Sequence, residues 1–372
     1  MKVAIVCLWS LFLACGSVRA QAQDLSFAPI DVSVSNPPIA FKADGRWNLV
    51  YELRITSFAD IGDTTITRVD VLDSQRKTLY GLAGDDLKAS TDPSAAIGLK
   101  LGPRTFTTVY MWITSSSLDD LPAGLRHRVT VKYSDPDSKD PEEASTETPV
   151  VPVDRKPVIV ISPPLRGDGW MASNGPSPTS VHRRAILPLE GHAVISQRFA
   201  IDWAQVYPDG EWYRGDPLNN KSYRSYGQMA YAVADGAITE AKDGIPENTP
   251  GPTSRAVEMT LETMPGNHII EQIGDGAYAT YAHLQPGSLR VKVGDHVRPG
   301  QVLGLLGNSG NSTAPHLHFQ ICNANSMMAC EGLPYAFNSF EVAGRWKPGD
   351  SISKHEMEIP TEGEVVNFVP TP

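Results

Sequence analysis

The stretch 291-VKVGDHVRPGQVLGLLGNSGNSTAPHLHF-319 decides which kind of fold this sequence encodes. Two turn pairs, Gly294-Asp295 and Pro299-Gly300, separate apolar runs of only a few residues. Such pairs are typical of tight turns between very short strands. The stretch therefore predicts a β-domain of the carrier-like or barrel-like kind, built from hairpins.

The same stretch ends in two histidines, His316 and His318, inside an otherwise apolar run. Because residues i and i+2 of a strand face the same side, both imidazoles should point into one space, with Leu317 and Phe319 directed toward a core. An isolated His-x-His pair is also compatible with two polar residues on a solvent-facing strand. The rest of the sequence has to decide between these interpretations.

Two further residues favour a functional site. His283 lies near the end of the β-type run "YATYAHL", and Asp202 lies between Ile201 and Trp203 in "QRFAIDW". A carboxylate in such apolar surroundings needs a partner, which would be a divalent cation or an arginine. Three histidines and one aspartate together favour a functional site, in which one imidazole could bind a metal while another handles protons.

With these motifs, the second half of the chain, from about residue 192 to 321, resembles the lysostaphin-type zinc endopeptidases, which cleave peptide cross-links in bacterial cell walls. The resemblance rests on "RFAIDW", "YGQMAYAVADGAI", "YATYAHL" and the long stretch quoted above. It implies a β-sheet peptidase domain with one Zn²⁺ and peptidoglycan peptides as substrate. It also implies that Asp202 and His318 bind the zinc, while His283 and His316 assist catalysis.

The sequence departs from this family at one ligand. The family has a zinc-binding histidine four residues before the aspartate, where this chain has Arg198, and a guanidinium has no free lone pair for a metal. We favour His182, in "SVHRRA", as the replacement, although it could equally be a loop residue paired with an acid. His192 has suitable strand parity but would lie about 33 Å away on a straight strand, and the amide oxygen of Gln197 is a poor zinc ligand.

Two functional hypotheses follow. The first is an exported zinc endopeptidase that hydrolyses peptidoglycan. In the second, the zinc is lost because Arg198 stands in a ligand position, which would let Arg198 pair with Asp202 and fill the place of the ion through a charge-assisted bond. That inactive domain would bind wall peptide or regulate a partner cell-wall hydrolase. A purely structural role explains neither the histidines nor Asp202, and the retained site residues favour the enzyme.

Other residues are assigned to the surroundings of the site. Cys322 and Cys330 form a close pair in a chain expected to be exported, which predicts a disulfide beside the two histidines. Asn220, Tyr226 and Tyr281 are predicted to form walls of the substrate groove.

The remaining sequence predicts an overall mainly β protein. Residues 24–153 alternate apolar and polar positions between turn clusters, which indicates an Ig-like antiparallel β-sandwich, with His127 expected on its surface. Residues 154–186 form a Pro- and Gly-rich linker, residues 187–345 the peptidase domain, and residues 346–372 a polar, loosely held tail.

The start of the chain predicts its destination. Residues 1–22 combine a basic start, a short apolar run and Ala20-Gln21-Ala22, which is the pattern of a cleavable signal peptide. We therefore expect a periplasmic or extracellular protein, and no stretch is apolar enough for a transmembrane segment. The formal net charge of -10 argues against nucleic acid as a partner.

Overall fold

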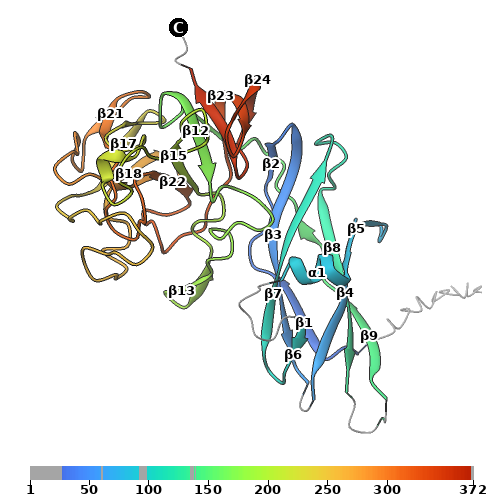
Figure 1. The fold of residues 1–372 in the computed structure, drawn as a ribbon. Coiled ribbons are helices and arrows are strands. Elements are labelled where there is room, and N and C mark those ends of the chain that lie inside the picture. The colour runs from blue at the N-terminus through green and yellow to red at the C-terminus, as the bar shows by residue number, and fades with distance from the viewer. Residues whose placement is uncertain (1–26, 60–61, 92–98, 135–137, 139, 370–372) are drawn as a thin grey trace, which may run out of the picture.

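The computed structural model describes residues 27–59, 62–91, 99–134, 138 and 140–369. In this part of the chain nearly all regular structure is β (Figure 1), accompanied by the six-residue helix α1 (Gly84–Ala89) and the 3-10 turn η1 (Asn220–Ser222). The mainly β prediction is therefore confirmed. The predicted signal peptide, residues 1–22, lies outside the described residues.

The N-terminal lobe consists of two antiparallel sheets that enclose one hydrophobic core. The strands of the first sheet are β1 (Ile30–Val34), β2 (Ala40–Ala43), β3 (Arg46–Ser57) and β7 (Phe106–Ser115). Those of the second are β4 (Thr64–Leu72), β5 (Thr78–Ala83), β6 (Lys100–Leu101), β8 (Gly124–Tyr133), β9 (Glu142–Glu147) and β10 (Val151–Pro152). Alternate residues of β3 and β7 meet those of β4 and β8 in the core, which explains the alternation in the sequence.

His127 lies in this core, so the expectation of a surface position was wrong. Its side chain is fully buried, its Nε2 atom lies 2.9 Å from the hydroxyl of Tyr51, and its Nδ1 atom lies 3.3 Å from that of Thr148. His127 has the same strand parity as Val129 and Val131, both of which are buried. That parity was readable from the sequence.

Burial of His127 should make the protein sensitive to acid. Burial lowers the pKa of His127 from 6.5 to about 4, so between these values the unfolded chain binds more protons than the folded one. Stability should therefore fall as the pH drops through this window, by roughly 3 kcal/mol in total. Urea unfolding from pH 7 to pH 4 should show a flatter profile for His127→Gln than for the wild type, whereas the exposed His296→Gln control should follow the wild type. Parallel profiles for wild type and His127→Gln would contradict this.

The C-terminal lobe is organised around an eleven-stranded sheet with the order β11-β23-β25-β12-β15-β22-β19-β18-β17-β20, and β24 pairs with β23. Its strands are β11 (Ile159–Ile161), β12 (Gly167–Ser173), β15 (Ile201–Gln205), β17 (Gly236–Lys242), β18 (Asn267–Gly274), β19 (Ala277–Leu284), β20 (His296–Val297), β22 (Leu317–Cys322), β23 (Tyr335–Arg345), β24 (Pro348–Glu358) and β25 (Glu364–Phe368). Two small two-stranded sheets complete the lobe. One is the hairpin of β13 (Leu187–Leu189) and β14 (His192–Val194), and the other pairs β16 (Met229–Tyr231) with the distant β21 (Val302–Leu305). As expected, strands β20 and β21 are very short, and Gly294 and Gly300 adopt positive φ in the turns beside them.

Two expected boundaries need correction. Strands β11 and β12 come from the expected linker, residues 154–186, and both belong to the large sheet. The expected loose tail, residues 346–372, supplies β24 and β25, and most of β25 is buried. The short apolar run of β25 is sufficient for a strand because its neighbours on both sides, β23 and β12, supply hydrogen bonds.

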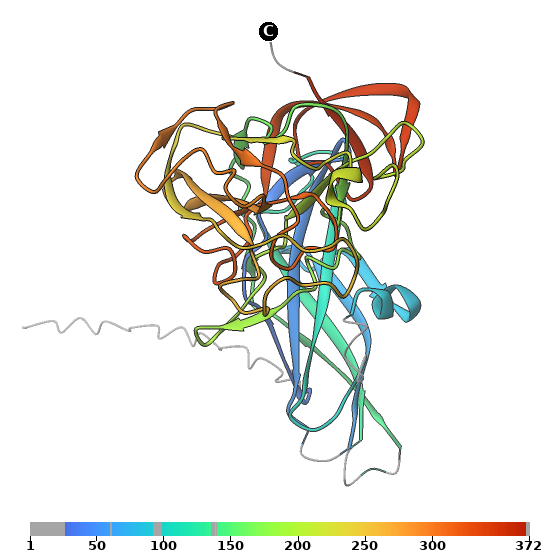
Figure 2. The same cartoon turned by 60° about the vertical axis from the view of Figure 1, so that its left-hand side comes forward.

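The two lobes are packed against each other rather than joined by a free linker (Figures 1 and 2). Phe41 and Val50 of the N-terminal lobe belong to the hydrophobic core of the C-terminal lobe, and the ring of Phe41 contacts that of Phe199 at 5.2 Å. Lys42 of β2 pairs with Glu358 of β24 at 2.8 Å. The relative position of the lobes is thus fixed by both apolar and ionic contacts.

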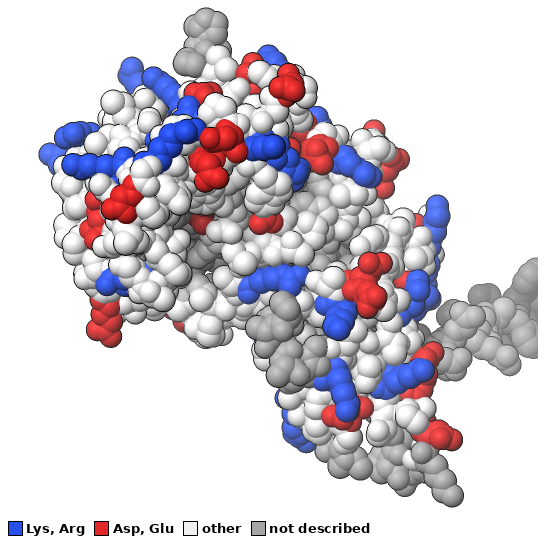
Figure 3. All heavy atoms as spheres, in the orientation of Figure 1, with Lys and Arg blue, Asp and Glu red and all other residues white. Residues whose placement is uncertain are grey.

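The surface is mixed in charge. Figure 3 shows basic and acidic side chains interspersed over both lobes on the face that it draws. Among the described residues, no helix has the length and hydrophobicity needed to cross a membrane.

Candidate active site

Asp202 and His318 lie directly opposite each other on neighbouring strands. Strand β15 pairs with β22 so that Asp202 faces His318, and an Asp202 oxygen, Oδ1, lies 2.8 Å from Nδ1 of His318. On β22 the alternate residues Leu317 and Phe319 are fully buried in the core. The predicted alternation is therefore what brings the two polar side chains together on the other face.

His316 joins this pair from just before β22. Its Nε2 atom lies 3.3 Å from the same Asp202 oxygen, so both histidines of the His-x-His pair point toward one carboxylate. The Nδ1 atom of His316 donates to the carbonyl of Ala314 at 2.8 Å. This bond leaves Nε2 as the atom that is directed into the site.

His283 reaches the site because of a β-bulge. On a regular strand it would share the direction of Tyr281, which pairs with Phe319 in the core, but the register between β18 and β19 shifts near this end. His283 has φ of 64°, and such an extra residue reorients the side chain. Its ring consequently lies 4.9 Å from that of His316 and 5.8 Å from that of His318, between ring centroids.

His182 is the residue that completes the cluster. It comes from the segment between β12 and β13, and its Nε2 atom lies 3.3 Å from Oδ2 of Asp202. One donor atom each from His182, Asp202 and His318 lie within 4.8 Å of one another. The structure thus brings together the residue that we favoured as the replacement ligand and the two that the resemblance implied.

A glutamine fixes the tautomer of His318. Gln320, two residues along the same strand, donates from its amide nitrogen to the carbonyl of Met327 at 2.9 Å, so its oxygen faces Nε2 of His318 at 2.8 Å. Nε2 must then carry the proton, and the lone pair of Nδ1 points toward Asp202. Second-sphere partners of this kind orient histidine ligands in metal sites.

The charge balance of the cluster also fits a cation. Burial opposes a charged carboxylate, yet His182 and His316 hold the pKa of Asp202 well below its usual range. Burial lowers the pKa of His318, despite the opposing effect of Asp202. A neutral imidazole lone pair and a carboxylate 2.8 Å apart repel each other unless a cation or a proton lies between them, so the donor set fits a zinc ion with three protein ligands and an open position.

The cluster opens into a cavity of about 270 Å³. Its lining includes all five residues of the cluster, together with several that were not predicted, among them Asn174, Arg255 and Asn311. Asn174 donates to Oδ2 of Asp202 at 2.9 Å. Gln320 was readable from its i+2 spacing to His318, whereas the sequence carries no signal for Asn174 or Arg255.

Arg198 does not contact Asp202, so the pairing required by the second hypothesis is wrong. Its guanidinium bonds Glu52 of the N-terminal lobe, at 2.9 and 3.1 Å, and Glu331, at 2.7 Å. Two carboxylates within reach satisfy the buried charge better than one carboxylate that already has three imidazole neighbours. His192, the other candidate ligand, is exposed on β14 away from the cluster.

The three predicted groove residues do not line the cavity. Tyr281 is fully buried and donates to Glu271, because it lies on the core side of β19. Asn220 and Tyr226 instead support the turn after β21: Asn220 accepts from Asn308 at 2.9 Å, and Tyr226 donates to Glu247 at 2.7 Å.

The predicted Cys322–Cys330 disulfide is present, with the two Cα atoms 5.8 Å apart. It closes the loop that contains Met327, the residue whose carbonyl holds Gln320. The disulfide thereby stabilises the second-sphere contact of His318.

Comparison with known protein families points to the same part of the chain as the site. Residues 223–329, which include His283, His316 and His318, match peptidase family M23. The chain contains an M23 peptidase domain. Asp202 and His182 lie before the matched residues, and the sheet pairing of β15 with β22 brings Asp202 to this domain.

Three relatives illustrate the similarity of the M23 domain. The chain is 32% identical over 120 residues to the glycyl-glycine endopeptidase ALE-1 of Staphylococcus capitis, covering 32% of this chain and 30% of that protein. It is 29% identical over 155 residues to lysostaphin of Staphylococcus simulans, covering 41% and 28%. It is 41% identical over 56 residues to the peptidoglycan DD-endopeptidase ShyA of Vibrio cholerae, covering 15% and 13%. The chain thus spans less than a third of each of these relatives.

Proposed function

We propose that this protein is a zinc-dependent endopeptidase that hydrolyses peptide bonds of bacterial cell-wall peptidoglycan, in the periplasm or outside the cell. The observation that carries the proposal is the convergence of His182, Asp202 and His318 on one point of the cavity, with His283 and His316 beside them. The M23 match and the endopeptidase names of the relatives support the reaction and the substrate class.

Different contacts position the three proposed ligands. Asp202 and His318 are held by the pairing of β15 with β22, and Gln320 keeps the Nδ1 lone pair of His318 available. His182 supplies the metal-binding nitrogen that the guanidinium of Arg198 cannot supply. A zinc ion in this position would polarise the scissile carbonyl and lower the pKa of a bound water toward neutrality.

His283 and His316 interact with the attacking water and with the charge that develops during hydrolysis. The Nδ1 atom of His283 donates to the carbonyl of Ser309 at 2.8 Å, as that of His316 does to Ala314, so both rings present Nε2 to the cavity. Burial lowers the pKa of His283 well below its usual range, and the neighbouring His316 lowers it further, so the ring of His283 stays neutral and its Nε2 can accept a hydrogen bond that orients the attacking water. Burial opposes a charged His316, but Asp202 raises the pKa of His316, which suits a ring that donates a hydrogen bond to the developing negative charge.

The regulatory alternative assumed that zinc is lost because Arg198 replaces a ligand, which His182 can supply instead, and that Arg198 would then pair with Asp202. Arg198 pairs with Glu52 and Glu331 instead. Among the described residues, only the histidines can place a positive charge beside the carboxylate of Asp202. We therefore retain the enzyme as the single proposed function.

The proposal is tested on the purified chain as it is exported. We expect about one zinc per molecule by elemental analysis, since a catalytic site of this type holds one ion, and release of soluble peptides from purified sacculi. Removal of the metal with a chelator should abolish the release, and added zinc should restore it. A protein that contains no zinc, takes none up and leaves sacculi intact would overturn the proposal.

A further inference from the structure

The segment that carries His182 has no regular structure of its own. Residues 174–186, between β12 and β13, contain neither helix nor strand. Its position therefore depends on side-chain contacts and turns rather than on a backbone ladder. The contacts on either side of the ligand show what fixes it.

The residue after the ligand, Arg183, is fully buried in the N-terminal lobe. Its Nη2 atom donates to the carbonyls of Tyr51, at 2.9 Å, and Met111, at 2.6 Å, while Nε donates to Glu52 at 3.2 Å. These acceptors belong to β3 and β7. The chain is thus fastened to the N-terminal lobe one residue beyond His182.

Arg184 adds a second attachment to the same lobe. Its guanidinium donates to the carbonyls of Ala89, at the end of α1, at 2.7 Å, and Thr91 at 3.2 Å. The ring of Tyr110 lies 5.2 Å below the same guanidinium. Both arginines that follow His182 therefore end in the N-terminal lobe, while His182 points back toward Asp202.

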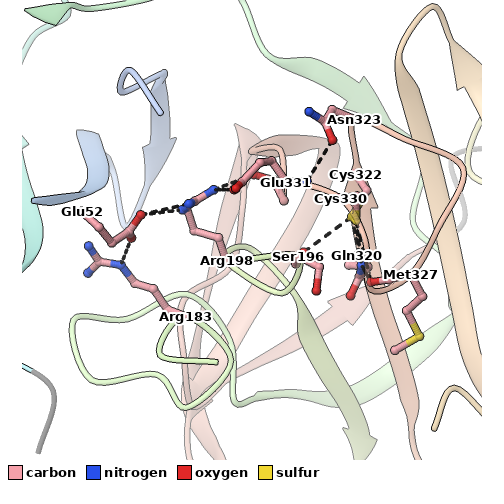
Figure 4. A network of polar contacts seen from close by, with 11 residues as sticks. Glu52, Arg183, Ser196, Arg198, Gln320, Cys322, Asn323, Met327, Cys330 and Glu331 are labelled. Carbon is pink, nitrogen blue, oxygen red and sulfur yellow. Dashed lines mark hydrogen bonds and ion pairs between the residues drawn. A yellow bond between two sulfur atoms is a disulfide. The ribbon is translucent and has the colours of Figure 1, made fainter. Parts of the chain in front are cut away.

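Glu52 is shared between this segment and the sheet that carries the other ligands (Figure 4). One oxygen accepts from Arg183, and the other accepts from Arg198 at 2.9 and 3.1 Å. Arg198 stands four residues before Asp202. A single carboxylate of β3 therefore pairs with two buried arginines, one beside His182 and the other four residues before Asp202.

The network continues to the third ligand. Arg198 pairs with Glu331 at 2.7 Å, and Glu331 follows the disulfide residue Cys330. The loop closed by this disulfide holds Gln320, which contacts His318. Figure 4 shows this succession of contacts from Glu52 to the disulfide loop.

We propose that the N-terminal lobe is an integral part of the metal site, with Glu52 as a positioning residue that holds His182 against Asp202 through Arg183 and Arg198. The inference rests on the proposed function, because it concerns the metal of the same site. The proposal also gives Arg198 a role. Where the family has a zinc-binding histidine, this chain has an arginine that pairs with Glu52 of the N-terminal lobe. The third ligand, His182, comes instead from the segment that Glu52 also holds through Arg183.

The test is a Co²⁺ titration of the full chain, followed by the visible absorption of the bound ion. Glu52→Gln keeps the size and one of the two acceptor oxygens but removes the charge. We expect it to weaken metal binding about 10-fold, the lower end of the range for loss of a residue that hydrogen-bonds to a ligand, because Glu52 acts on His182 only through Arg183. At saturating Co²⁺ its spectrum should move toward that of His182→Ala. The matched control is Glu147→Gln, which breaks an ion pair with Arg128 in the same lobe, far from the site, and should bind Co²⁺ like the wild type.

The outcomes separate this inference from the proposed function. Unchanged affinity and spectrum in Glu52→Gln, with a metal-binding and active wild type, would overturn the inference alone. A wild type that binds neither Co²⁺ nor Zn²⁺ would overturn both. If Glu52→Gln fails to fold, as judged by circular dichroism, Arg184→Met replaces it: this variant leaves Glu52 intact and should lower the affinity about fivefold, as expected for a lost hydrogen bond, and an unchanged affinity would count against the inference.

Discussion

Replacement of His318 by alanine should leave the protein without bound zinc and without activity on sacculi. His318 faces Asp202 across the sheet at 2.8 Å, and its removal leaves only two ligands where a catalytic zinc usually has three. The loss of zinc affinity should exceed the 10- to 100-fold effect of removing a residue that only hydrogen-bonds to a ligand. His182→Ala should behave in the same way if His182 is the third ligand.

The measurement is zinc per molecule together with peptide release from sacculi. His192→Ala is the matched control, because His192 was the other histidine considered as a ligand and is exposed away from the cluster. It should keep both metal and activity. A folded His318→Ala protein that still holds one zinc would show that the ion is bound elsewhere, and an unchanged His182→Ala protein would remove His182 from the ligand set.

Replacement of Arg198 by methionine should destabilise the fold by about 3–5 kcal/mol, the range for breaking a buried ion pair by removing one partner. Only 6% of the Arg198 side chain is exposed, and it lies between Glu52 and Glu331. Burial opposes its charge, but the two glutamates outweigh burial and raise the pKa of Arg198 above its usual value. Without the arginine, Glu331 loses this partner and Glu52 keeps only Arg183.

Urea unfolding at pH 7 measures this effect. Arg214→Met is the control, since the pair of Arg214 with Asp209 is more than half exposed on both sides, and it should change the stability by less than about 1 kcal/mol. Equal stabilities for Arg198→Met and the wild type would mean that the ion pairs of Arg198 with Glu52 and Glu331 contribute nothing to the stability of the folded state.

The sequence was sufficient for the parts of the site that depend on strand alternation. The alternation of Leu317 and Phe319 with His316 and His318 predicted the direction of both imidazoles, and the position of Asp202 between Ile201 and Trp203 indicated that it needed a partner. Likewise, the glycine turns of residues 291–319 indicated short strands. In each case the deciding interactions are local.

The errors on His127 and Tyr281 were misread strand parity, whereas the positions that the sequence could not fix depend on interactions between distant segments. His283 faces the site only because a bulge breaks the alternation that puts Tyr281 in the core, and its position depends on contacts with Pro265 and Gly307. His182 could be nominated from the sequence but not assigned, because its segment is fixed by Glu52, 131 positions away from Arg183. The strands near the chain's end were missed because their stability comes from neighbours that are distant in sequence.

The position of β25 inside the large sheet has a consequence for the order in which the sheet can assemble during folding. This strand lies between β23 and β12, and β12 in turn borders the strand that carries Asp202. Residues 364–368 follow the site histidines in the chain, yet β12 lacks one of its two neighbours until they pair with it. A chain in which this strand has not yet paired would hold its catalytic groups on a sheet that is still open along an inner edge, so the site should become fully ordered only when β25 is in place.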